Sequence, residues 1–88
     1  MGKTTDDFYG QLSRLLTEGS NLGFAAVEVN AGQLHRLVGD YPDPKRHRMP
    51  VCCDVMLSTM ALGDEVVARP PKGKGASLTI RYQFPRVI

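Results

Sequence analysis

Apolar and polar side chains alternate strictly from Ser77 to Phe84, and this alternation constrains the fold more than any other feature. Period-two alternation rich in β-branched and aromatic residues indicates a strand with one buried face. The expected buried side chains are Leu78, Ile80, Tyr82 and Phe84. A shorter run, 65–69, is the natural partner strand, so residues 65–84 predict a β-hairpin. Its connection contains Lys72 and Lys74 among glycines, which predicts a basic tip that can approach another surface closely.

The first part of the chain predicts a helix and a short strand. Residues 5–18 place apolar side chains at helical spacing, namely Phe8, Leu12, Leu15 and Leu16. Threonines before this helix can cap it, and Gly19 is its expected stop. Residues 24–29 predict a strand with Val27 and Val29 inward, paired with an edge of the hairpin.

Two further helices are expected before the hairpin. Residues 31–38 predict the second, capped by Asn30 and ended by Gly39. Its expected buried side chains are Leu34, Leu37 and Val38. Two prolines then interrupt any helix, and Pro50 suits the first turn of a third helix over 49–61. That helix is expected to bury Val51, Cys52, Val55, Met56, Thr59 and Met60.

The predicted order of elements is helix, strand, helix, helix and hairpin. We therefore expect a single α+β domain, residues 1–88, with a winged helix-turn-helix fold. In it, three helices pack on a small antiparallel sheet with a C-terminal β-hairpin wing. The third helix would be the recognition helix. A hydrophobic content of 42% and a charged content of 23% are ordinary for a globular protein.

Charge is distributed unevenly along the chain although its net value is only +2. Residues 1–44 hold three basic and six acidic side chains, against eight and three in residues 45–88. Such asymmetry predicts a face for an anionic partner, and solvated basic loops are the alternative explanation. Basic groups before the third helix would cluster at the positive N-terminal end of its dipole, where free N–H groups already favour a phosphate. The expected DNA-contacting residues are Lys45, Arg46, His47, Arg48, Arg69, Lys72, Lys74 and Arg81.

The expected outward face of the third helix supports DNA binding less well. Base readout usually comes from Arg, Lys, Asn or Gln. This face offers instead Cys53, Asp54, Leu57, Ser58 and Ala61. Asp54 repels phosphate, and an exposed Leu57 suits a protein partner or a thymine methyl. The alternative function is a protein-interaction module, for instance an adaptor or a phage-type inhibitor of a nucleic-acid-binding machine.

Other chemistry finds little support in the sequence. Cys52 and Cys53 are adjacent, so on a helix they diverge by about 100° and chelate a metal poorly together with His35 or His47. We expect Cys52 to be a buried structural thiol. The sequence predicts no enzyme, no cofactor and no metal. No apolar run approaches a membrane span and no signal peptide is indicated, so a cytoplasmic protein is expected.

Several segments resemble small bacterial modules associated with restriction-type and HNH endonuclease proteins. These segments are 32–36 (GQLHR), 41–42 (YP), 47–53 (HRMPVCC), 63–64 (GD) and 70–78 (PPKGKGASL), and they lie within residues 32–78, about half of the chain. The chain contains no HNH catalytic motif. The resemblance implies a free-standing accessory module that binds DNA. The order of elements also resembles winged-helix regulators in general.

Overall fold

A computed structural model describes residues 4–39, 48–71 and 75–85 of the chain. These residues form an α+β fold of three helices and one three-stranded antiparallel sheet. The elements are α1 (Thr5–Asn21), β1 (Ala26–Asn30), α2 (Ala31–Val38), α3 (Met49–Thr59), β2 (Glu65–Ala68) and β3 (Thr79–Gln83). The predicted α+β class and order of elements are confirmed. Of the helices in this part of the chain, none is long and apolar enough to cross a membrane.

The last strand lies in the middle of the sheet, in the order β1-β3-β2. It pairs antiparallel with both neighbours, so that Val29 of β1 and Val66 of β2 both face Ile80. A register irregularity interrupts the β2 pairing between Val66 and Ala68. The predicted hairpin and the predicted pairing of the upstream strand with it are therefore both confirmed.

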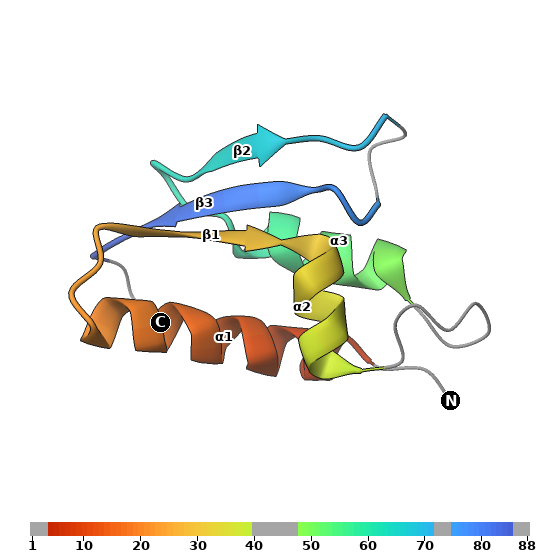
Figure 1. Cartoon of the computed structure of the whole chain (residues 1–88), viewed down its shortest axis with the longest axis horizontal. Helices are drawn as coiled ribbons and strands as arrows, with labels where there is room; N and C mark the ends of the chain where they lie inside the picture. The colour runs from red at the N-terminus through yellow and green to blue at the C-terminus, as the bar shows by residue number, and fades with distance from the viewer. Residues whose placement is uncertain (1–3, 40–47, 72–74, 86–88) are drawn as a thin grey trace.

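All three helices lie on one side of the sheet (Figure 1). The alternation of the last strand explains this layer: Leu78, Ile80 and Tyr82 are buried toward the helices, and Phe84 packs at the edge of the core. The Tyr82 hydroxyl donates a hydrogen bond of 2.8 Å to the carbonyl oxygen of Met56, which satisfies the only polar group of that ring. The central strand is thereby bonded to α3 as well as packed against it.

The first helix extends past Gly19, the residue at which we expected it to stop. Its start is a capping box between Thr4 and Asp7, and its last residue is Asn21. Gly19 is buried instead, and there is no room for a side chain at this position. A Cβ there would lie 2.5 Å from Cγ2 of Val27. The glycine therefore allows β1 to approach the helix closely rather than ending it.

The second helix has the predicted bounds and caps, but one of its expected core residues is wrong. The Gln33 N–H donates to Oδ1 of the N-cap Asn30 at 3.1 Å, and Gly39 at the other end has a φ of 118°. Leu37 is 58% exposed, whereas His35 is fully buried. Positions 31, 34, 35 and 38 form the inward stripe at helical spacing, and position 37 falls outside it.

We predict that Ile80→Ala will lower the free energy of unfolding by about 2–5 kcal/mol, because it leaves a cavity in the centre of the core. Val67→Ala, on the exposed side of the edge strand β2, is the matched control and should cost about 0.5 kcal/mol. Urea denaturation of both variants measures the difference. Equal losses would contradict the packing of β3 described above.

Candidate nucleic-acid interface

The described residues that flank two basic segments of the sequence lie toward the same end of the molecule. Residues 45–47 and 72–74, which include Lys45, Arg46, His47, Lys72 and Lys74, lie outside the described residues. The described ends that flank them are the end of α2, the start of α3, the end of β2 and the start of β3. All four lie on the right of the view in Figure 1. Arg48, the N-cap of α3, and Arg69, which follows β2, are exposed.

A direct contact joins the connection between β2 and β3 to α3. The Cys53 thiol donates to the carbonyl oxygen of Gly75 at 3.4 Å. Gly75 directly follows the segment 72–74, and Arg48 directly follows 45–47. Because Arg48 and Cys53 are five positions apart on one helix, they are separated by about 7.5 Å along its axis. The described residues that directly follow the two basic segments, Arg48 and Gly75, therefore lie within two turns of the start of α3.

Cys53 was expected on the outward face of the third helix, and this expectation is wrong. The side chain is fully buried, and its thiol lies against the backbone at Gly75. Cys52 is also fully buried, as predicted, and its thiol donates to the carbonyl oxygen of Ala31 at 3.5 Å. The adjacent thiols thus bond α3 to two different neighbours. Within the described residues, no three His, Cys, Asp or Glu side chains are grouped to hold a metal ion.

A buried histidine supports the start of α3, a role that the sequence did not indicate. His35 of α2 accepts a 2.8 Å hydrogen bond at Nε2 from the backbone N–H of Arg48. No side chain caps α3, and the His35 ring instead satisfies the backbone N–H of the N-cap residue Arg48 itself. Phe8 packs edge-on against the ring, with the centroids 4.8 Å apart. The sequence offered His35 only as a metal candidate, since its partner lies 13 positions away in another element.

The start of α2 is closed to an anionic ligand, although a depression of about 360 Å³ lies beside it. The depression is lined by Asn30, Gly32, Gln33, Arg36 and Ala76. The first three N–H groups of the helix already donate to protein oxygens, those of Leu78, Ala76 and Asn30, at 2.8, 3.0 and 3.1 Å. A helix start binds an anion through free N–H groups, and here these three are occupied.

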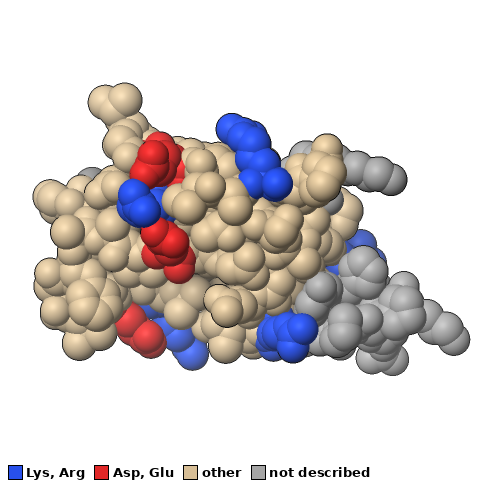
Figure 2. Space-filling view, turned by 45° about the horizontal axis from the view of Figure 1, so that its top comes forward, with Lys and Arg blue, Asp and Glu red and all other residues tan. Residues whose placement is uncertain are grey.

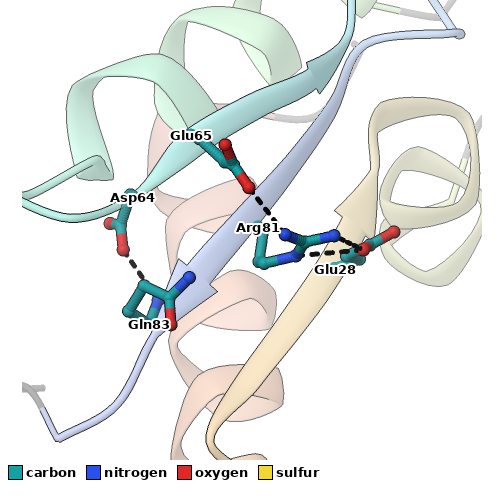
Figure 3. A network of polar contacts seen from close by, with 5 residues as sticks. All are labelled: Glu28, Asp64, Glu65, Arg81 and Gln83. Atoms are coloured by element: carbon teal, nitrogen blue, oxygen red, sulfur yellow. Dashed lines mark hydrogen bonds and ion pairs between the residues drawn. The ribbon is translucent and has the colours of Figure 1, made fainter.

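The sheet face opposite the helices carries an ion-pair network that spans all three strands (Figure 3). Arg81 of β3 contacts Glu28 of β1 at 2.7 Å and Glu65 of β2 at 2.6 Å. The hydrogen bonds to Glu28 and then the two negative charges raise the pKa of the Arg81 guanidinium above its ordinary value. Arg81, Glu28 and Glu65 together carry a net charge of −1. Arg81 therefore does not add positive charge to a DNA-binding surface as the sequence suggested.

The charged side chains visible in Figure 2 are unevenly placed. Acidic groups lie in the left half of that view, and the basic group between them belongs to an acid–base–acid cluster. Of the other basic groups, one lies beside an acidic group at the lower left, one lies near the upper middle, and others lie toward the right beside the residues that are not described. The acidic groups seen on this face therefore gather in its left half, whereas basic groups are spread along it.

The exposed side of α3 is narrower than the sequence predicted. Pro50, Asp54 and Ser58 are exposed and follow one another at four-residue spacing, which places them in one row along the helix. Leu57, expected to be exposed, is partly buried and packs against the core. The helix ends at Thr59 instead of position 61, because Met60 has an extended ψ of 139°.

No family model, no curated protein and no solved structure matches the chain.

The buried thiol of Cys52 predicts a pH dependence of stability. Burial raises its pKa from 9.0 to about 12, with the charge of Cys53 as a second cause. The pKa of this thiol is therefore higher in the folded state than in the unfolded state. Below about pH 9 the thiol is protonated in both states, and its contribution to the free energy of unfolding is complete. As the pH rises toward 12 the unfolded state loses the proton first, so that contribution is lost. Wild type should therefore lose more stability than Cys52→Ala between these values in urea denaturation. Parallel losses in the two proteins would contradict the burial of this thiol.

His35→Phe keeps an aromatic ring in the core and removes the acceptor for the Arg48 N–H. We expect the free energy of unfolding to fall by about 1–3 kcal/mol, the usual effect of leaving a buried polar group without its partner. Leu37→Ala, on the exposed side of the same helix, is the control and should cost much less. Thermal or urea denaturation provides the measurement. An unchanged stability of His35→Phe would show that the Arg48 N–H is satisfied equally well by water.

Proposed function

We propose that this chain is a non-enzymatic winged-helix module that binds double-stranded DNA. In this proposal α3 is the recognition helix and the β2–β3 hairpin is the wing. The observation that carries the proposal is the contact between Cys53 and Gly75, together with the position of Arg48 as N-cap of α3. These features bring the described residues that flank both basic segments, Arg48 and Gly75, to the first two turns of one helix.

The proposed phosphate contacts come from five side chains of the two segments, from Arg48 and from Arg69. The five are Lys45, Arg46, His47, Lys72 and Lys74. Cations at this end would act together with the positive end of the α3 dipole. We leave Arg81 out of the set because two carboxylates already bind its guanidinium. Such contacts hold a protein on the duplex and carry no sequence information themselves.

Two further arguments support the proposal. The order helix, strand, helix, helix and hairpin is that of winged-helix domains, which place one helix in the major groove. The resemblance of segments 32–36, 47–53 and 70–78 to modules of restriction-type and HNH endonuclease proteins also favours an accessory DNA-binding role.

A protein-interaction module is the second candidate. The observation that favours it is the exposed row of α3, where Asp54 is the charged member. A negatively charged row without cations suits a basic or donor-rich protein surface. An adaptor or an inhibitor of a nucleic-acid-binding machine would use α3 in this way.

Duplex affinity measured against salt concentration tests the DNA proposal. Each phosphate contact contributes about −0.9 to the slope of log K against log salt. Replacing Lys72 and Lys74 with Ala should weaken binding at low salt and flatten this slope by about 2. Replacing Arg46 and Arg48 should have a similar and additive effect. Arg14→Ala, on the exposed side of α1, is the matched control and should leave the slope unchanged.

The outcome for wild type decides between the two candidates. Fluorescence anisotropy with a labelled duplex at about 50 mM salt is sufficient, because non-specific DNA binding is strong there. If wild type shows no salt-dependent binding to any duplex, the DNA proposal fails and the protein-interaction module takes its place. A slope that Arg14→Ala changes as much as the lysine variant would contradict the assigned surface.

A further inference from the structure

Large apolar side chains are exposed at the end of the molecule opposite the start of α3. Leu62 is 104% exposed, Leu22 is 71% exposed and Phe24 is 54% exposed. Leu22 and Phe24 lie in the turn between α1 and β1, and Leu62 lies in the turn between α3 and β2. Figure 1 shows both turns on the left, away from the described ends that flank residues 45–47 and 72–74. These side chains therefore belong to a surface other than the proposed DNA interface.

The end of β3 joins the two turns into one surface. β3 is antiparallel to both neighbours, so its end lies between the starts of β1 and β2. On one side the Phe84 N–H donates to the carbonyl oxygen of Ala25 at 2.9 Å. On the other side the Gln83 N–H donates to Oδ1 of Asp64 at 2.7 Å. The two turns are therefore about two strand spacings apart, roughly 10 Å, and one bound segment can contact both.

Hydrogen bonds hold both turns in place. In the turn that carries Leu62, the Asp64 N–H donates to the carbonyl oxygen of Ala61 at 3.0 Å. The Ala61 N–H in turn donates to Oδ2 of Asp64 at 2.8 Å. In the turn between α1 and β1, the Phe24 N–H donates to the carbonyl oxygen of Gly19 at 3.1 Å. A bonded turn has little backbone freedom left to lose on binding, which favours affinity for a partner.

Acidic side chains flank the exposed apolar ones. Glu18 is four positions before Leu22 on α1, and Asp64 is two positions after Leu62. The adjoining ion-pair network of the outer sheet face carries a net charge of −1. Arg14, the cation of α1, lies one turn further from this end than Glu18. In Figure 2 the acidic side chains lie just inside a left margin of uncharged described residues. Among the described residues, negative charge therefore exceeds positive charge around this surface.

The charges decide which kind of partner fits. Two copies of the chain meeting at these turns would bring their acidic side chains together, which opposes self-association. DNA would be repelled by the same charges. A protein segment with apolar side chains flanked by Lys or Arg would cover the leucines and meet the acidic rim with opposite charge. This is the usual anatomy of an interface, an apolar centre with a polar rim.

We propose that the surface formed by Leu22, Phe24 and Leu62 docks a protein segment whose apolar side chains are flanked by Lys or Arg. The inference goes beyond the proposed function and does not depend on it. It also differs from a protein interface on α3, because the two turns lie at the other end of the molecule. The chain can therefore hold DNA and this partner at the same time.

Selection from a phage-displayed library of random peptides on tethered wild type tests the inference. Enriched peptides should combine large apolar residues with Lys or Arg, and added salt should weaken their binding. The double variant Leu22→Ser and Leu62→Ser should bind such a peptide about 5- to 30-fold more weakly. Leu37→Ser, at a comparably exposed leucine of α2, is the control and should bind as wild type does. Glu18→Gln should also weaken binding, whereas Asp6→Asn at the other end of α1 should not.

Each result supports or overturns the inference. It fails if the enriched peptides are acidic, if Leu37→Ser weakens binding as much as the double variant does, or if no peptide is enriched. A wild-type dimer in sedimentation that the double variant dissociates would show that a second copy covers the surface, which also overturns it. The salt slope of duplex binding should be the same in wild type and the double variant, so the DNA proposal is decided separately. Thermal denaturation should show every variant folded, since all the substituted side chains are exposed.

Discussion

Burial of one side of the central strand β3 is the constraint on which the rest of the structure depends. Ile80 and Tyr82 are inaccessible to solvent, and the hydroxyl of Tyr82 bonds to the backbone of α3. Since β3 pairs with both β1 and β2, its position fixes the whole sheet. A slip of one residue would turn this apolar side toward solvent, so the register is strongly specified. The helices, and α3 in particular, are placed by the same apolar surface.

The third helix is held by polar contacts in addition to this packing. Thiols of Cys52 and Cys53 bond it to the start of α2 and to Gly75, and His35 accepts the backbone N–H of its N-cap. These groups are buried and bonded, which is the condition under which polar groups stabilise a core. They also determine which segments adjoin α3. The cysteines thus orient a candidate interface without taking part in metal binding or catalysis in our proposal.

The outer face of the sheet and the end of the molecule where α3 begins differ in charge in our proposal. Arg81 is bound by Glu28 and Glu65, so the outer sheet face has no excess of positive charge from this trio. Exposed ion pairs of this kind contribute little stability, typically below about 1 kcal/mol. Their effect in our proposal is on orientation: an anionic duplex is attracted to the end of α3 and not to this face. Electrostatic complementarity acts mainly on approach and specificity.

The sequence by itself determined the elements, because their signals are local. Alternation over Leu78–Phe84 predicted β3 and its buried side, and Asn30 and Gly39 predicted the bounds of α2. Contacts between distant segments were decided by the tertiary structure. The buried Cys53 bonds to Gly75, 22 positions away, and Arg81 is neutralised by an acid 53 positions away. Periodicity describes one element at a time, so it cannot show which side of a helix a remote loop covers or which charges meet across a sheet.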